Sequence, residues 1–136
     1  MFAVIGKKIQ ERLNSQSAFT AINGSNRVYP VYVAEGATYP NTIYEITNVS
    51  DFITKESNLD SVDLSLEFTC YADTYQDTYT QAKALVEALS RYSVTYTEDS
   101  VSYTASFRFD TLRDGYVRVN QKFYKEINFD CLIIKN

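Results

Sequence analysis

Carboxylates are the side chains of this sequence that could most readily do chemistry. Asp73 and Asp77 lie four positions apart, as do Asp110 and Asp114, and a close pair of carboxylates could serve acid–base catalysis or bind a divalent cation. The first pair falls at the predicted start of a helix, where negative charge complements the helix dipole. The second pair lacks the alternating oxygen ligands of a calcium loop, and Asp114 begins an Asp-Gly turn dipeptide. We therefore expect structural roles for both pairs.

The side chains on which most enzymes and metal sites depend are missing. The chain has 136 residues and no histidine, which removes the commonest general base and metal ligand, and with it Ser-His-Asp and Cys-His pairs. The four glycines are too far apart for a Walker loop or a dinucleotide fingerprint. Cys70 and Cys131 form no Cys-x-x-Cys motif, and we expect two buried, reduced thiols. The residues thus predict no catalysis, no metal and no cofactor.

Composition and charge narrow the class of protein further. Hydrophobic residues make up 45% of the chain and charged residues 22%, which is typical of a soluble globular protein, and we expect one domain over residues 1–136. The net charge of −4 disfavours binding to nucleic acid, because phosphates would be repelled. No uncharged apolar stretch approaches the roughly 20 residues that cross a bilayer, and the N-terminus does not have the pattern of a secretion signal. We expect neither export nor contact with a membrane.

Hydrophobic periodicity predicts two helices. Residues 2–13 form an amphipathic pattern, and one more helical turn is expected around residues 18–22. A second helix begins after Asp73 or Thr74 as N-cap, with Gln76 or Asp77 completing a capping box. Its predicted buried stripe consists of Tyr75, Tyr79, Ala82, Val86 and Leu89, widened by Leu85 and Ala88.

The remaining segments predict a mainly antiparallel sheet. Residues 62–71 alternate strictly between apolar and polar side chains, as a strand with one buried face does. Pro30 cannot donate to a sheet ladder, so the strand around it should lie at an edge. The order α-β-β-β-α-β-β-β predicts an α+β fold with both helices packed on one face of the sheet. The expected strands are 27–33, 42–47, 62–71, 94–96, 101–109 and 123–134, with a turn at 99–100 and a polar connection over 110–115.

Twelve tyrosines and eight phenylalanines without a tryptophan are the unusual feature of the composition. The RNP1 pattern of an RNA-stacking sheet is missing, so most of these rings are expected in the core. A tyrosine outside the core suits contact with another protein, because it combines a large apolar ring with a hydroxyl that tolerates water. The candidates for such contacts are Tyr29, Tyr39, Tyr44, Tyr71, Tyr116 and Tyr124.

Three segments together resemble the small tail-completion proteins of long-tailed bacteriophages, which include tail terminators and tail-to-head joining proteins. The first runs from RVYP at 27–30 through AEG at 34–36 to YPNTIY at 39–44. The second is the strand-to-helix junction FTCYADTY at 68–75, and the third is the aromatic closing strand 123–134. These motifs are hydrophobic and structural, so they indicate a shared fold more strongly than a shared activity.

The resemblance implies a virion protein that caps the finished tail tube, at the head-proximal end, after assembly in the cytoplasm of the host bacterium. Its implied partners are further copies of itself in a hexameric ring, the tail tube protein and the head–tail connector, and DNA only as a passing molecule in an acidic channel. A ring of this kind needs two unlike surfaces on each subunit. The interface candidates are Tyr29, Pro30, Glu35, Tyr39, Tyr44, Phe52, Lys55, Glu56, Arg113 and Tyr116.

Two other readings stay open on the residues alone. A small enzyme that uses two carboxyl groups, as glycosidases do, would need a deep pocket with the two groups about 5–10 Å apart. A protein–protein interaction domain outside any virus would have the same composition. Its oligomeric state would separate it from a protein that forms rings.

Overall fold

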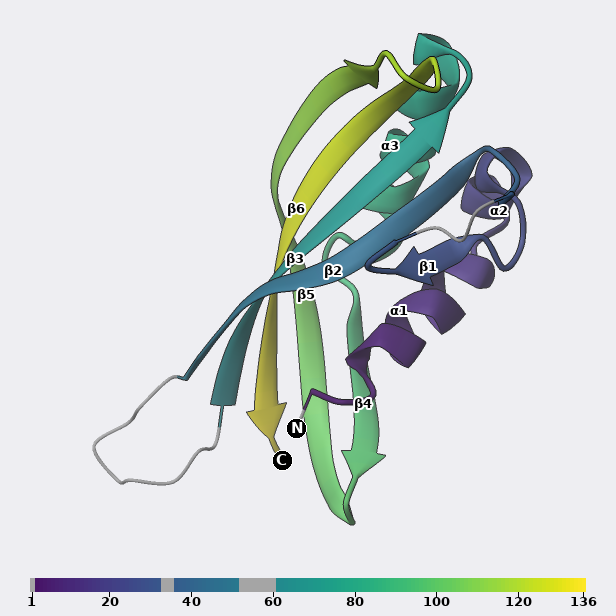
Figure 1. Cartoon of the computed structure of the whole chain (residues 1–136). Coiled ribbons are helices and arrows are strands. Elements are labelled where there is room, and N and C mark those ends of the chain that lie inside the picture. The colour runs from purple at the N-terminus through teal and green to yellow at the C-terminus, as the bar shows by residue number, and fades with distance from the viewer. Residues whose placement is uncertain (1, 33–35, 52–60) are drawn as a thin grey trace.

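The computed structural model describes residues 2–32, 36–51 and 61–136 (Figure 1). Within these residues three helices accompany a six-stranded, curled sheet with the strand order β1-β2-β3-β6-β5-β4. Only β1 and β2 run parallel, and every other pair is antiparallel. The predicted α+β class is confirmed. In chain order the elements are α1 (Ile5–Asn14), α2 (Ser17–Asn23), β1 (Val28–Pro30), β2 (Asn41–Asp51), β3 (Ser61–Ala72), α3 (Tyr75–Leu89), β4 (Ser93–Glu98), β5 (Val101–Val117) and β6 (Lys122–Lys135).

The core lies between the helices and one face of the sheet. Along β3 every second residue is buried, from Val62 to Ala72, as the alternation predicted. At the centre, the rings of Phe68 on β3 and Phe129 on β6 meet edge to face, with centroids 5.6 Å apart. We call the opposite face of the sheet, with Asp63, Glu67 and their cross-strand neighbours, the open face.

Helix α1 buries Ile5, Ile9 and Leu13 as predicted, but it begins at Ile5 rather than at residue 2, and Phe2 is exposed. The turn expected around residues 18–22 is a full helix, α2, with Phe19 buried. Thr74 caps α3 by accepting a hydrogen bond from the Asp77 N–H at 3.1 Å.

The predicted buried stripe of α3 is partly wrong. Tyr75 and Tyr79 are about half exposed, and the buried face instead includes Thr78 and Gln81 beside Ala82, Leu85 and Leu89. The two polar side chains can turn inward because each finds a partner there. The aromatic rings are left at the flank of the helix, where they remain available for contacts.

A buried polar network explains why Gln81 lies in the core. Its side-chain N–H groups donate to Asn23 Oδ1 at 2.7 Å and to the Asn41 carbonyl at 2.8 Å, and Thr42 donates to the same Asn23 oxygen at 2.8 Å. All four residues are buried. The network thereby ties α2 and α3 to the beginning of β2, since buried polar groups require such partners.

The predicted connection over residues 110–115 is wrong, because β5 continues through it to Val117. The register shifts between Phe109 and Thr111, so the strand absorbs one extra residue as a bulge. Gly115 is no turn residue. It lies opposite Tyr124, whose ring occupies the space that a side chain at 115 would need.

The turn predicted at 99–100 is present. Asp99 and Ser100 both have positive φ, 52° and 65°, as a two-residue hairpin turn requires.

Both edges of the sheet are partly uncovered. Strand β1 is an edge strand, as Pro30 predicted, but it is shorter than expected and pairs only with residues 42–44 of β2. At the other side, β4 pairs only with residues 101–106 of β5. Among the described strands, β1 with later β2 forms one edge of the sheet, and β4 with later β5 forms the other.

Candidate interaction surfaces

One carboxylate of each pair singled out as possibly catalytic or metal-binding has a structural partner. Asp73 forms an ion pair with Lys122, and Asp114 accepts a hydrogen bond from the Tyr75 hydroxyl at 2.7 Å. In the described part of the chain, no group of three or more histidine, cysteine, aspartate or glutamate side chains is arranged to hold a metal ion. None of the helices that the structure describes is long and apolar enough to span a membrane.

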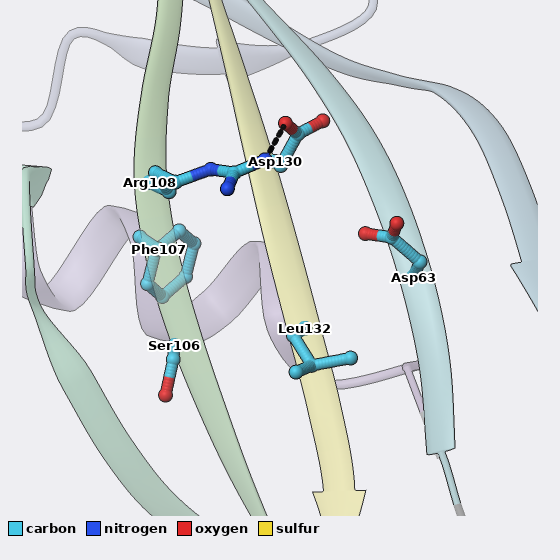
Figure 2. A pocket seen from close by; sticks show the side chains of 6 residues that line it. All are labelled: Asp63, Ser106, Phe107, Arg108, Asp130 and Leu132. Carbon is cyan, nitrogen blue, oxygen red and sulfur yellow. Dashed lines mark hydrogen bonds and ion pairs between the residues drawn. The ribbon is translucent and has the colours of Figure 1, made fainter. Parts of the chain in front are cut away.

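Carboxylates dominate the open face. Figure 2 shows Asp63 on β3 and Asp130 on β6 beside a hollow of about 310 Å³, which Arg108 of β5 also lines. Arg108 donates to Asp130 at 3.1 Å. Burial raises the pKa of the Asp63 carboxyl, and the nearby charge of Asp130 raises it further, while Arg108 acts in the opposite direction.

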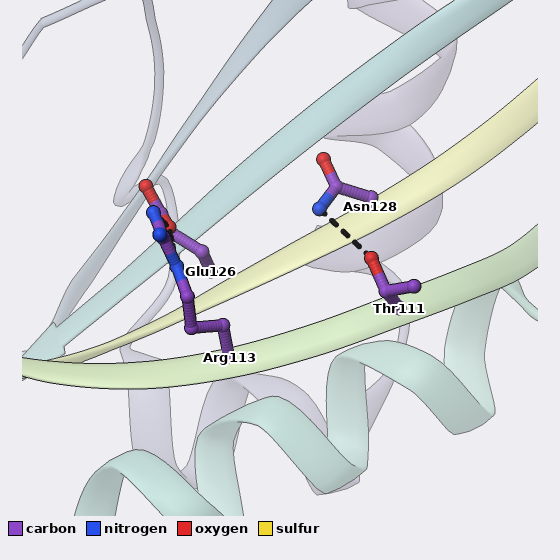
Figure 3. A network of polar contacts seen from close by, with 4 residues as sticks. All are labelled: Thr111, Arg113, Glu126 and Asn128. Atoms are coloured by element: carbon purple, nitrogen blue, oxygen red, sulfur yellow. Dashed lines mark hydrogen bonds and ion pairs between the residues drawn. The ribbon is translucent and has the colours of Figure 1, made fainter.

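A second polar row crosses the same face further along the strands. Figure 3 shows Arg113 of β5 reaching Glu126 of β6 on the side of the sheet away from α3, and its Nε donates to Glu126 Oε2 at 2.6 Å. Next to them, the Asn128 amide donates to Thr111 Oγ1 at 3.0 Å. These cross-strand pairs bridge β5 and β6 just beyond the bulge.

The same row continues across β3 and β2, where it brings glutamates together. Glu45 on β2 is directly opposite Glu67 on β3, and both line a hollow of about 330 Å³ with Glu126, Tyr71 and Tyr124. Burial, followed by the charges of Glu126 and Glu45, raises the pKa of Glu67. The open face thus presents Asp63, Asp130 and these three glutamates against Arg108 and Arg113.

A groove of about 310 Å³ separates α3 from β5 on the helix side of the sheet. Beneath it Lys125 of β6 is only 2% exposed. Its Nζ lies 3.4 Å from Asp114 Oδ2 and 3.7 Å from the centre of the Tyr75 ring. Hydrogen bonds from Tyr75 and then from Lys125 lower the pKa of the Asp114 carboxyl. The groove, called the α3–β5 groove below, is lined by Tyr79, Ala82, Lys83, Val86, Glu87, Phe109, Leu112 and Lys125.

A protruding pair of side chains marks the opposite edge of the sheet. After Pro30 the chain makes a three-residue turn, in which the Tyr32 N–H donates to the Pro30 carbonyl at 2.7 Å. The central residue, Val31, has φ 66°, and a γ-turn of this hand is rare and strained, above all with a β-branched residue. Val31 is 65% exposed and Tyr32 is 72% exposed. We call these two residues the β1 knob.

The sequence-predicted interface residues are scattered over several surfaces. Pro30, Arg113 and Tyr116 are exposed, and Tyr29 and Tyr39 are half-buried, the latter against Tyr71. The structure thus leaves these five partly or fully accessible but does not bring them into one patch. Glu35, Phe52, Lys55 and Glu56 lie outside the described residues.

Tyr44 is better explained as a core residue than as a contact residue. It is 9% exposed and belongs to the hydrophobic core, where its ring lies near Phe68 and its hydroxyl approaches Gly6 of α1. The strand period placed Tyr44 correctly in a strand. Only the position of α1 over that strand explains why the ring is covered.

Several residues of these surfaces escaped the sequence analysis. Val31 and Tyr32 were assigned to a strand, Tyr75 and Tyr79 to the core, and Lys125 to no role. The alternation of buried positions along β6 includes Lys125, so the strand period was a usable signal. Because lysine is normally exposed, the buried position of Lys125 was not predicted.

The two cysteines meet the expectation of buried, reduced thiols. Both are free and buried, and burial raises the pKa of Cys70 and of Cys131 to about 12. A thiol with such a pKa is almost entirely protonated near neutral pH and is therefore a poor nucleophile.

Comparisons with known proteins find similarity in structure but not in sequence. No family model matches the chain, and neither does any curated protein. The chain superposes on a chain from the virion of a native gene transfer agent particle with a TM-score of 0.74 and 14% identity, and the match covers 100% of both chains. At this level of identity, the likeness shows a shared fold and leaves the role open.

Proposed function

We propose that this protein is a structural component of a phage-like virion, specifically the tail terminator that caps the tail tube and joins it to the head connector. The observation that carries the proposal is the full-length likeness in fold to a chain of a gene transfer agent virion. The resemblance of segments 27–44, 68–75 and 123–134 to tail-completion proteins supports the same role. The protein acts by presenting surfaces to other proteins, and it makes or breaks no bond.

A closed hexameric ring is the proposed working form. Rings arise when one patch of a subunit meets a different patch of its neighbour and the rotation closes. Edges suit this purpose, because they offer backbone groups and side chains to a neighbour. The sheet has two separate edge regions, at β1 with later β2 and at β4 with later β5, which supports a head-to-tail arrangement.

If the edges contact neighbours, one face of the sheet points toward the ring axis. We assign the open face to this inward position. Five carboxylates stand there against Arg108 and Arg113, and Lys122, near one end of the sheet, is paired with Asp73. Six subunits, each with a net charge of −4, would form an acidic channel. Such a channel lets DNA pass without adhering, since phosphates are repelled.

The proposal is tested by assembling particles without this protein. Heads and tail tubes should form but fail to join, and addition of the purified protein should restore complete particles in the electron microscope. A matched control adds the protein after heat denaturation. Particles that join normally without the protein would contradict the proposed role.

A further inference from the structure

We infer that the β1 knob of one subunit inserts into the α3–β5 groove of the next subunit, so that a second copy of this chain fills the groove. The inference rests on the proposed ring and names the contact that builds it. It combines two surfaces that sequence analysis did not identify.

Most of the large exposed apolar side chains in the described residues fall into two groups, with Val119 and Ile134 outside both. One group lies at the β1–β2 edge and the other beside the groove, and isolated apolar residues elsewhere would need no explanation. The first group consists of Phe2, Val31, Tyr32, Ile46 and Val49, and the second of Tyr75, Tyr79, Leu112 and Tyr116. Since strands β3 and β6 separate β2 from β5, the two groups lie toward opposite edges of the sheet. A head-to-tail contact requires two unlike surfaces placed in this way.

The shapes of the two surfaces are complementary. The knob consists of two exposed side chains that follow the edge strand β1, while the groove is a hollow of about 310 Å³ with Val86, Phe109 and Leu112 in its lining. A tyrosine ring inserted into an apolar pocket is the usual anchor of a protein interface. The positive φ of Val31 is a strained conformation for a β-branched residue. Backbone strain of this kind clusters at functional sites, where a particular presentation of side chains is required.

The polar groups are complementary as well. An ammonium group carries three N–H donors, and within the described residues Lys125 contacts one carboxylate oxygen and one ring face. The hydroxyl of an inserted tyrosine supplies a further acceptor to this buried charge. In addition, Glu45 lines a hollow beside Val31, and the groove lining includes exposed Lys83 and Glu87, so the orientation of the knob that brings Glu45 toward Lys83 is favoured.

The test uses two variants that each disable one surface. Tyr32→Glu places a charge on the knob, and Leu112→Glu places a charge in the groove. Both positions are exposed, so both variants should fold, which circular dichroism and thermal unfolding would verify. Val119→Glu is the matched control, because Val119 is 97% exposed on the β5–β6 turn, outside both surfaces.

Oligomeric state is measured by light scattering, in free solution and on purified tail tubes. Each of the two variants alone should be monomeric where the wild type and Val119→Glu form rings. An equal mixture of the two variants should form dimers and no larger assembly. Tyr32→Glu keeps an intact groove and Leu112→Glu keeps an intact knob, so each pair can make one contact only. This result distinguishes a head-to-tail contact from a symmetric one.

A disulfide provides an independent readout. Tyr32→Cys combined with Leu112→Cys in one chain should give a ladder of cross-linked subunits, and neither substitution alone should give more than dimers. The native thiols do not interfere, since both are buried with a pKa of about 12. Dimers from the mixture and a ladder from the double variant are the expected results.

Other outcomes separate this inference from the proposed function. If the wild type and Tyr32→Glu both form rings, or the mixture stays monomeric, the knob–groove contact is wrong and the tail role stands. If Tyr32→Glu forms rings that no longer cap tubes, the knob binds the tube, which also overturns the inference. A wild type that is monomeric both in solution and on tubes would overturn the inference and the ring together.

Discussion

Glu45 on β2 and Glu67 on β3 occupy directly opposed positions on the open face of the sheet. Like charges in such positions destabilise a sheet, and the raised pKa of Glu67 reflects its burial together with the charges of Glu126 and Glu45. Stability therefore does not explain why two carboxylates face each other at this place. An acidic channel supplies a reason.

Glu67→Gln should therefore stabilise the isolated subunit at pH 7, by about 0.2–1 kcal/mol. Because the folded-state pKa of Glu67 lies above its ordinary value of 4.5, the carboxyl favours folding when protonated, and that contribution is lost as the pH rises through the raised pKa. The advantage of the variant should thus shrink as the pH falls toward 4. Urea unfolding at several pH values measures it.

Glu126→Gln serves as the control for this prediction. It also removes a carboxylate near Glu67, but it deprives Arg113 of a charged acceptor, so no gain in stability is expected. A Glu67→Gln protein less stable than the wild type at pH 7, or a difference that does not change with pH, would argue against the proposed repulsion.

Gly6→Ala tests the contact between α1 and β2. In a helix, alanine is normally more stable than glycine by about 1 kcal/mol, but a β-carbon at position 6 would lie 2.5 Å from the Tyr44 hydroxyl. We expect a loss of about 1–3 kcal/mol in the free energy of unfolding instead. Adding Tyr44→Phe removes the nearest atom and should recover part of the loss. Strictly additive effects would show that the two residues do not touch.

Gln81→Ala tests the buried polar network. The substitution removes the amide that donates to Asn23 Oδ1 and to the Asn41 carbonyl. Asn23 Oδ1 keeps its hydrogen bond from Thr42, whereas the Asn41 carbonyl loses its side-chain donor. An abandoned buried group costs about 1–3 kcal/mol, so the free energy of unfolding should fall by about 1–3 kcal/mol. Gln76→Ala, on the exposed side of the same helix, should change it by less than about 0.5 kcal/mol. Equal effects at the two positions would contradict the network.

Lysine in place of open-face carboxylates tests the proposed channel. Asp63→Lys and Glu67→Lys should each retain the fold, because Asp130 and Glu45 respectively lie nearby as partners. Particles carrying both changes should eject DNA more slowly or incompletely, since the channel would then bind phosphates. Glu11→Lys makes one such charge reversal on α1, against two on the open face, and should leave ejection unaltered. Normal ejection of DNA from the doubly substituted particles would contradict the proposal that the open face lines the channel.

Much of the fold could be predicted because local patterns and tertiary packing agree. The strict alternation of residues 62–71 became β3, and Pro30 ended up in an edge strand. In both cases the residues themselves limit the structure, by burial of one face or by a missing N–H. The capping residue Thr74 likewise acts within four positions of chain.

The failures share one cause, which is dependence on residues distant in sequence. Gly115 suggested a turn, yet Tyr124 on the facing strand explains its lack of a side chain. Lys125 is buried because Tyr75, fifty positions earlier in the chain, offers its ring face and Asp114 its carboxylate. The candidate surfaces depend on such contacts, so the sequence patterns located only part of them.

Imaging the purified protein with purified tail tubes in the electron microscope tests the central claim most directly. Binding as a single closed ring at one end of each tube is the expected result, and Val119→Glu should bind in the same way. Protein that decorates the whole length of the tubes, or that leaves both ends bare at concentrations where it is folded, would contradict the role of a tail terminator.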